Sequence, residues 1–417
     1  MTRLLTGLSL GYFLVMLDTT IVTVALPSLS SSLPDQQWIS NGYTLTFAAF
    51  LLTAGAWSDR FGARRLFFTG LVSFAGLSLV SALAFSTPML IALRALLGIA
   101  GALLVPSSLS LIAAAYPAPA SRAKAMGVWA AVSGTGLVAG PLLGGVLTEA
   151  FGWRAIFLVN VPVAVVALAL SRSAPATQPK PGRMDVAGQV SAVVALSTLT
   201  YALVEGSPWL LPVSVIAAAV FVASQRRPGA MLPPRLLTWS LLAGAIVNFG
   251  LSGVLFVLSL SFQETRGYPP SSTGLAFLPL TIPTAFNPFF TGRLVARIGP
   301  RIPAVAGFLL MSAGTLIQAF SPPVLLSALG LALLGFGVSL AIPSLLTAVV
   351  GAAPPELAGV AGGALNASRQ TGAVLGVAIL GALVSGTSTA FALATAAVVL
   401  LAGAATVASE RVRVSTF

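Results

Sequence analysis

The segment GAWSDRFGARR at residues 55–65 returns in altered form as GRLVARIGPR at residues 292–301. Gly, Arg, Gly and Arg match at the first, sixth, eighth and tenth positions of the two copies, which lie 237 residues apart. Each copy stands between two long apolar runs, so each is expected to join a pair of membrane spans. Two such copies at equivalent places indicate that the chain consists of two related halves. The alternative is a chance similarity between two basic loops.

The composition is that of a membrane protein. Of the 417 residues, 57% are hydrophobic and 7% are charged, whereas a soluble domain carries about 25% charged residues. The apolar runs are continuous, without a period of two, which excludes a membrane β-barrel and favours an all-α polytopic membrane protein. The sequence has no Cys and no His, so we expect no disulfide, no metal site and no cofactor.

The apolar runs predict fourteen spans. They cover residues 4–28, 38–57, 66–86, 88–115, 123–148, 153–171, 185–205, 208–224, 238–262, 271–292, 301–320, 322–350, 357–384 and 387–409. Since eight spans separate the two copies of the repeat, two halves of six spans leave two spans as an insert. We therefore expect a six-helix bundle at 1–171, a linker with two inserted spans at 172–236, and a second six-helix bundle at 237–417.

Positive charge supports an even span count with both termini in the cytoplasm. Two basic residues, Arg154 and Arg266, fall in the gaps on one side, and Arg94 and Arg369 fall within spans. The other seventeen fall in the gaps or termini on the opposite side: Arg3, Arg60, Arg64, Arg65, Arg122, Lys124, Arg172, Lys180, Arg183, Arg226, Arg227, Arg235, Arg293, Arg297, Arg301, Arg411 and Arg413. Cytoplasmic loops carry such an excess. The net charge of +12 therefore indicates topology, and we expect no nucleic-acid partner.

One carboxylate lies deep in the first span, in the stretch LVMLDTTIVTVALP at residues 14–27. A charge at that depth costs at least ~2.5–3.5 kcal/mol, so Asp18 is expected to face water or a partner. The functional interpretation is a proton or cation site. The alternative is a structural Asp bonded to Thr19, Thr20 or another helix.

Arg94 lies six residues inside the fourth span and needs a partner for the same reason. Asp18 is one candidate, and backbone carbonyls freed near Pro27 or Pro106 are another. A facing Arg would lower the pKa of Asp18 and desolvation would raise it, so alternation between two environments would couple protons to transport. The alternative is an Arg that snorkels to the interface.

Four motifs carry a resemblance to a known family. Residues 17–27 (LDTTIVTVALP), 55–65, 94–102 (RALLGIAGA) and 136–145 (GLVAGPLLGG) resemble the first-span, inner-loop, fourth-span and fifth-span motifs of the major facilitator superfamily. The combination is similar to its fourteen-span drug:proton antiporter family. The resemblance implies the major facilitator fold, two six-helix bundles plus two inserted helices, and a secondary active transporter rather than an enzyme.

The resemblance assigns roles to two sets of residues. The inner loop implies a cytoplasmic gate of Gly55, Asp59, Arg60, Gly62 and Arg64, in which Asp59 pairs with a nearby Arg and latches the cytoplasmic face shut. The alternative is a loop that only sets topology, and the second copy has Ala296 in place of Asp59. The fifth-span motif implies an antiporter hinge of Gly136, Gly140, Pro141, Gly144 and Gly145. The alternative there is generic small-residue packing.

Several polar and aromatic residues are candidates for the wall of a central cavity. They are Trp38, Tyr43, Asn248, Asn287, Asn366, Arg369 and Gln370. Arg369 is expected to balance Asp18 across that cavity. Dications are expected to be poor substrates, because this region holds no further carboxylate.

The leading hypothesis is proton-coupled efflux of lipophilic drugs or natural products across the cytoplasmic membrane. We expect a monomer in the bilayer that takes an amphipathic small molecule as substrate, with protons as the coupling ion. A proton-coupled importer of a small polar solute is the rival within transport. A rival of another class is a non-transporting membrane sensor or an intramembrane enzyme.

Overall fold

The computed structural model describes residues 3–177, 185–227, 230–232, 236, 238–354 and 357–409. These residues form helices and connecting segments, with no strand among them. The prediction of an all-α membrane protein is therefore confirmed. Five of the basic residues counted above, Lys180, Arg183, Arg235, Arg411 and Arg413, lie outside the described residues.

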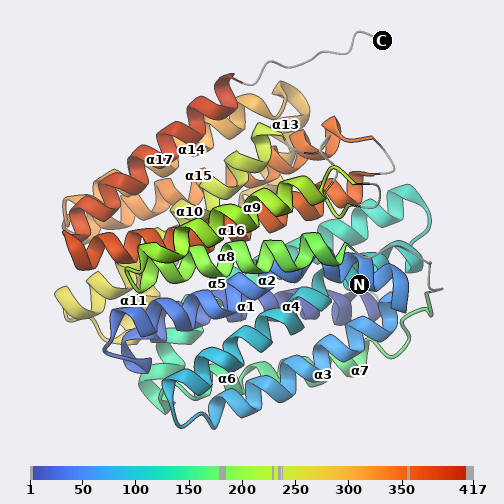
Figure 1. Cartoon of the computed structure of the whole chain (residues 1–417), viewed down its shortest axis with the longest axis horizontal. Helices are drawn as coiled ribbons and strands as arrows, with labels where there is room; N and C mark the ends of the chain where they lie inside the picture. Colours follow the sequence, from blue (N-terminus) through green and yellow to red (C-terminus); the bar gives the residue numbers. More distant parts are fainter. Residues whose placement is uncertain are drawn as a thin grey trace.

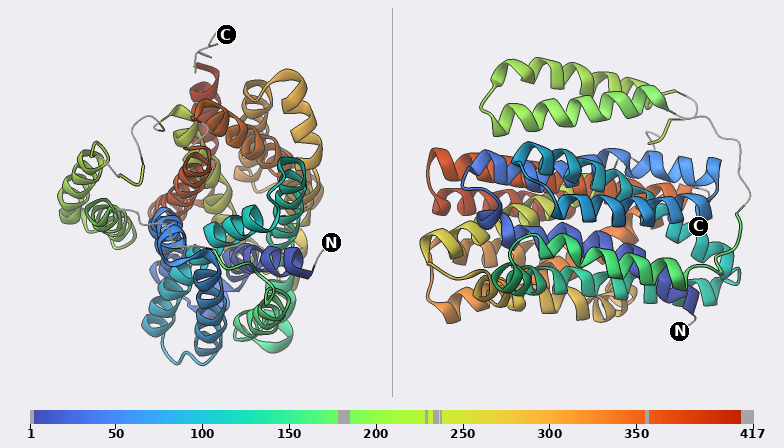
Figure 2. Two further views of the ribbon diagram at one scale, coloured as in Figure 1. Left: turned by 90° about the vertical axis from the view of Figure 1, so that its right-hand side faces the viewer. Right: turned by 90° about the horizontal axis from the view of Figure 1, so that it is seen from below.

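The helices fall into two bundles and an outlying pair (Figures 1 and 2). The N-terminal bundle holds α1 (Arg3–Leu29), α2 (Leu33–Phe61), α3 (Ala63–Ala82), α4 (Thr87–Ala115), α5 (Pro119–Phe151), α6 (Ala155–Leu158) and α7 (Asn160–Leu170). The outlying pair is α8 (Val186–Val204) and α9 (Leu211–Ser224), joined by the short η1 (Pro208–Leu210). The C-terminal bundle holds α10 (Trp239–Leu260), η3 (Ser261–Thr265), α11 (Pro270–Ala276), α12 (Leu278–Phe286), α13 (Pro288–Ile298), α14 (Arg301–Ala319), α15 (Val324–Ala352), α16 (Ala358–Gly386) and α17 (Thr389–Ser409).

The helix contacts of one bundle are repeated in the other. α1 packs on α5 and α7 as α10 packs on α16 and α17. α4 packs on α2 and α3 as α15 packs on α12 and α14, and α3 meets α7 as α14 meets α17. Between the bundles, α2 packs on α16 and α5 packs on α11 and α12. The packing therefore follows the two-fold repeat that residues 55–65 and 292–301 indicate.

Ten helices are long and apolar enough to cross a membrane, and the segments Ala155–Leu170 and Pro208–Ser224 are shorter apolar helices. α2 is not among the ten, because it carries polar residues such as Gln36, Gln37 and Asn41 along with its apolar ones. The connections between α1, α2, α3, α4 and α5 are short, so successive members of this series run in opposite directions. One end of the molecule therefore holds the start of α1 and the other holds its last turn. We call these the Arg3 end and the Leu29 end.

The repeated motif is mostly helical, which corrects the expectation of a loop. α2 continues through Asp59 and Arg60 to Phe61, and α3 begins at Ala63, so Gly62 alone separates them. In the second copy Gly299 lies between α13 and α14, separated from Arg301 by one proline. Both glycines have positive φ, +89° and +79°, a conformation that residues with a Cβ rarely adopt. The shared glycine therefore serves to turn the chain.

Two expected spans are broken helices. The sixth span divides at Val159 into α6 and α7, and the tenth divides into α11, α12 and α13. The helices α11, α12 and α13 each have a proline at their first or second position: Pro270, Pro279 and Pro288. Proline lacks an N–H and fits the first turn of a helix but not its interior. The breaks follow from that placement.

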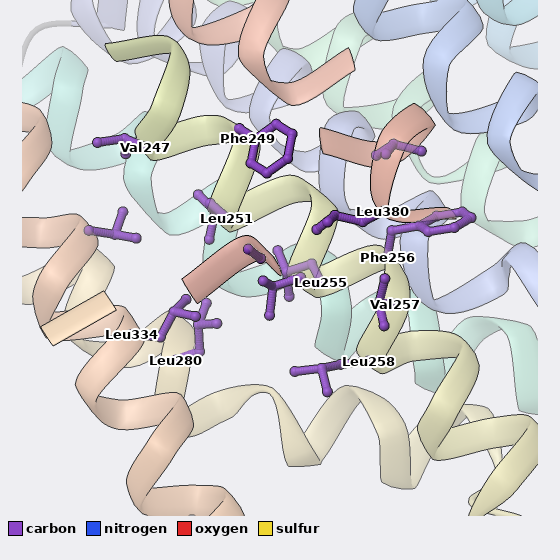
Figure 3. Close-up of a cluster of buried hydrophobic side chains, with 14 of the residues drawn as sticks. Val247, Phe249, Leu251, Leu255, Phe256, Val257, Leu258, Leu280, Leu334 and Leu380 are labelled. Carbon is purple, nitrogen blue, oxygen red and sulfur yellow. The ribbon is translucent and has the colours of Figure 1, made fainter. Parts of the chain in front are cut away.

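An apolar core fills the C-terminal bundle (Figure 3). Leu255 and Phe256 of α10 lie in it with Leu280 of α12, Leu334 of α15 and Leu380 of α16, all almost fully buried. Burying one such side chain contributes about 1.5–3 kcal/mol. This core holds α10 and α16 as one unit, on which the C-terminal polar residues are placed.

Candidate functional site

Asp18 and Arg94 form a buried ion pair. Their side chains are 0% and 1% exposed, and Nη1 of Arg94 contacts Oδ2 of Asp18. The other carboxylate oxygen, Oδ1, accepts a hydrogen bond from Nδ2 of Asn160 at 3.0 Å. Asn160 begins α7 directly after the break at Val159, and its Nδ2 also lies 3.4 Å from the hydroxyl of Ser78. Both carboxylate oxygens are thus occupied, which compensates for the loss of water around the charge.

The close approach of α2 and α4 places Arg94 against Asp18. A Cβ on Gly98 would overlap the backbone carbonyl of Tyr43, so the glycine lets the two helices meet. The Nε of Arg94 donates to the carbonyl of Ile39 at 3.1 Å, and its guanidinium lies 4.6 Å from the centre of the Tyr43 ring. Tyr43 is fully buried. The Tyr43 ring covers Arg94, and this buried position corrects the assignment of Tyr43 as a cavity residue.

The ion pair lies inside the N-terminal bundle. Its partners come from α1, α2, α4 and α7, all of that bundle. The face of α1 that carries Asp18 is therefore turned away from the C-terminal bundle, and the carboxylate does not face the gap between the two bundles. The expectation that Arg369 balances Asp18 is also wrong here, because Arg94 has that role.

The residues assigned to a hinge join three helices. Gly136, Gly140 and Gly144 lie against α1, where a Cβ on any of them would overlap Phe13, Thr20 or Ile21. Gly145 lies against Pro270 of α11, and the carbonyl of Pro141 lies where a Cβ on Gly274 would be. The stripe therefore connects α5 to its own bundle and to the opposite bundle.

The face of α5 that meets α11 is packed at one end and open at the other. Residues seven positions apart share a helix face, so Gly134 and Gly127 continue the face of Pro141 towards the Arg3 end. A Cβ on either glycine would meet nothing within 4 Å. The bundles are thus in contact at the Leu29 end of α5 and separated along its other half.

Five hydrogen bonds between the bundles lie at the Leu29 end. Nε2 of Gln37 donates to the carbonyls of Val377 and Ala378 at 2.9 and 3.0 Å. Ser259 Oγ donates to the carbonyl of Thr23 at 2.8 Å, and Gln263 Nε2 to that of Val24 at 2.9 Å. The N–H of Ser271 donates to Oε2 of Glu149 at 3.0 Å. The structure is therefore closed at the Leu29 end.

The residues assigned to a gate surround the Arg3 end of α2. Asp59, Arg60 and Arg64 are exposed, and Asp59 makes no ion pair with any described residue. The backbone N–H of Ala63 donates to Oγ1 of Thr177 at 2.7 Å, and Nη2 of Arg64 donates to the carbonyl of Arg172 at 3.2 Å. The loop thus binds the linker after α7, and the expected latch of Asp59 is not formed in this conformation. Gly55, on the same helix, faces Pro106 of α4.

Two of the expected cavity residues bond neighbours elsewhere. Nε1 of Trp38 donates to Glu205 at 2.7 Å, and its ring meets Tyr201 of α8, so Trp38 holds the outlying pair. Nδ2 of Asn287 donates to Ser339 of α15 at 2.7 Å, inside the C-terminal bundle. In this conformation the polar atoms of both side chains are engaged in these contacts, and their place in a cavity wall stays a prediction.

Three of the expected cavity residues, Asn366, Arg369 and Gln370, lie within one turn or so of α16, and Arg369 contacts α10. Nε of Arg369 donates to Oδ1 of Asn248 at 3.2 Å. Gln370 is buried, and Oδ1 of Asn366 has no hydrogen-bond donor among the described residues. Arg369 is half-buried and forms no ion pair with any described residue.

Two aromatic residues that the motifs did not point to lie near this group. Tyr12 of α1 packs against the same N-terminal cluster of buried residues as Ala367, two residues before Arg369 in α16. Its ring stacks on Trp129 of α5 with centroids 4.4 Å apart and planes 18° apart. Their spacing relative to the motifs carried no signal, because aromatic residues are common throughout the apolar spans.

The comparisons with known proteins agree with this architecture. The sequence pattern of the Major Facilitator Superfamily matches residues 8–377 and 240–413. The chain belongs to this superfamily, and it is a multi-pass membrane protein of the transporter class rather than an enzyme.

Relatives of known name cover nearly the whole chain. It is 35% identical over 407 residues to the methylenomycin A resistance protein of Streptomyces coelicolor, covering 92% of this chain and 86% of that protein. It is 34% identical to the multidrug resistance protein Stp of Mycobacterium tuberculosis, covering 92% and 76%. It is 35% identical to the tetracenomycin C resistance and export protein of Streptomyces glaucescens, covering 91% and 75%.

Solved structures share the fold at lower identity. The POT family transporter PepTSo superposes with a TM-score of 0.74 at 14% identity, covering 97% of this chain and 96% of that one. A bacterial homologue of the human lysosomal transporter Spinster gives 0.65 at 20% identity, covering 97% and 94%.

Proposed function

We propose that the protein exports lipophilic drugs or natural products across the cytoplasmic membrane. The observation that carries the proposal is the set of relatives at 34–35% identity over nine-tenths of the chain, which are named for drug resistance or export. The stripe from Gly136 to Gly145 supports it, because those glycines place α5 at the junction of the two bundles.

The topology that we propose has fourteen spans with both termini in the cytoplasm. The ten long apolar helices and the two shorter ones make twelve. α2 and the series α11–α13 supply the remaining two, since each bridges neighbouring spans that run in the same direction. The excess of basic residues at the Arg3 end supports a cytoplasmic position for that end. The structure then corresponds to an inward-open conformation.

Proton coupling is assigned to the Asp18–Arg94 pair. Protonation of Asp18 would remove the charge that holds Arg94 and would leave the guanidinium without compensation. The helices α1, α2, α4 and α7 meet at this pair, so its rupture would change how they pack. The enclosed position in this conformation requires that Asp18 reach water in another one. Asp59 would then pair with an arginine and close the cytoplasmic side.

The test is an efflux assay in whole cells with a panel of dyes and antibiotics, run with and without a protonophore. We expect export that stops when the proton gradient collapses. Proton release from purified protein on substrate addition should be present in wild type and lost in Asp18→Asn. Release that persists in Asp18→Asn would remove this residue from the coupling mechanism. Uptake instead of efflux would favour the importer.

A further inference from the structure

Arg369 is a cation without a counter-charge in the interior of the described structure. Among the described residues, Asp18 is the one carboxylate more than a helical turn away from a helix end, and Arg94 neutralises it. Arg369 lies eleven residues inside α16, about 16 Å along the helix axis. At that depth an uncompensated charge is costly, and such residues face a watery cavity or a ligand.

Most of the donors of Arg369 are free. A guanidinium has five N–H groups, and Nε donates to Asn248. No described residue accepts a hydrogen bond from the terminal nitrogens, and neither of these is sealed from solvent. The planar fork of a guanidinium matches a carboxylate, which it binds through two parallel hydrogen bonds.

An aromatic surface of the N-terminal bundle packs against the same cluster of buried residues as Ala367, two residues before this cation. Tyr12 is nine residues inside α1, about 14 Å along its axis. Tyr12 and Trp129 stack as one surface, and Nε1 of Trp129 donates to Ser108 Oγ at 3.1 Å, which fixes the indole ring. The cation belongs to the C-terminal bundle and the aromatic pair to the N-terminal bundle, and substrates of such transporters bind between the bundles.

We propose that the substrate is an organic acid with an apolar or aromatic body. Its carboxylate, or another monoanionic group, binds the terminal nitrogens of Arg369, and its body lies on Tyr12 and Trp129. The inference rests on the proposed export function and names the chemical class that the site accepts. It narrows the expected amphipathic substrate to an acid, because the interior acid of the described structure, Asp18, is already paired with Arg94.

The test compares three probes that share an aromatic body: pyrenebutyric acid, its methyl ester and pyrenebutylamine. Their affinities for the purified protein are measured by pyrene fluorescence. We expect wild type to bind the acid about ten-fold or more tightly than the ester or the amine, the factor expected for hydrogen bonds to a charged group. Arg369→Gln should lose this ten-fold advantage in affinity for the acid. Its affinity for the ester should stay within about two-fold of the wild-type value.

Two further variants serve as controls. Arg369→Lys keeps the charge without the fork and should recover part of the affinity for the acid. Arg227→Gln removes one exposed positive charge after α9 and should change nothing, which separates a site from a general charge effect.

The two proposals fail in different ways. Equal affinity of wild type for acid and ester, a preference for the amine, or equal losses for both probes in Arg369→Gln would overturn the organic-acid site. Export of the dye panel by wild type would still stand in that case. If wild type exports nothing from cells, the export function fails, whatever the binding assay shows.

Discussion

At the scale of single residues, the membrane interior holds two arginines in different situations. Arg94 has a carboxylate, a carbonyl and an aromatic ring as neighbours, and almost none of its surface is exposed. Arg369 has one amide oxygen, and its remaining donors are free. The sequence placed both within predicted spans but did not distinguish them. α1 is apolar on every face, so no amphipathic pattern shows which side Asp18 occupies.

Removing one charge of the Asp18–Arg94 pair should destabilise the protein through the charge that is left behind. Asp18→Asn leaves Arg94 buried without compensation and should lower the free energy of unfolding by about 3–5 kcal/mol. The double variant Asp18→Asn, Arg94→Gln should lose less than the sum of the two single variants. Thermal unfolding in detergent measures both. Asp59→Asn is the matched control, because Asp59 is exposed and unpaired among described residues. Strict additivity would contradict the coupling.

Dications should be poor substrates. Asp18 is neutralised and enclosed, and Arg369 would repel a cation near the gap. Efflux of a dication and of a monocation with the same aromatic body should be compared in cells. Strong proton-driven efflux of the dication, absent with the monocation, would contradict the charge assignment.

At the scale of elements, α5 shows how one helix serves two contacts. Its stripe from Gly136 to Gly144 packs on α1, and its Pro141 and Gly145 pack on α11. The sequence predicted an all-α membrane protein with many apolar helices correctly, because continuous apolar runs are a strong signal. It did not predict that residues 58–61 continue α2. Charged residues at the end of a span suggest a loop, although Arg is a good helix former. The role of Trp38 was also missed, because its partner Glu205 is 167 positions away.

The two faces of α5 should respond differently to the same substitution. Gly140→Ala places a Cβ against Thr20 and should destabilise the protein by about 1–3 kcal/mol through overpacking. Gly134→Ala, six residues earlier in the same helix, meets open space and should be neutral or slightly stabilising. Unfolding temperature and dye efflux give the comparison. Similar losses in both variants would show that the stripe acts through the backbone of α5 and not through contact with α1.

At the scale of the whole molecule, the two ends of the bundle differ. Five hydrogen bonds that involve side chains close the Leu29 end, whereas α5 is open around Gly134 and Gly127 towards the other end. Transport requires that this pattern reverse, because a substrate must be accessible from one side at a time. The repeated packing of the bundles makes a rocking motion the simplest route.

Distance measurements would detect that reversal. The chain has no cysteine, so spin labels can be attached to introduced pairs alone. The distance between Ala123→Cys of α5 and Ala296→Cys of α13 should shorten when the Arg3 end closes. The distance between Phe85→Cys and Ser385→Cys, near the Leu29 end, should lengthen. Gln37→Leu should shift the population towards the second state, because it removes two hydrogen bonds between the bundles. Both distances changing in the same direction would contradict rocking.

The outlying pair gives the molecule an uneven flank. α8 packs on both α2 and α16 and is tied to α2 by Trp38 with Glu205 and by Thr53 with Gln189. It therefore shields the seam where those two helices meet, as the left view in Figure 2 shows. Apart from α11, which leads directly into α12, no described helix packs on both α5 and α12. A compound dissolved in the lipid would then enter the space between the bundles from one side only, at the seam of α5 with α12.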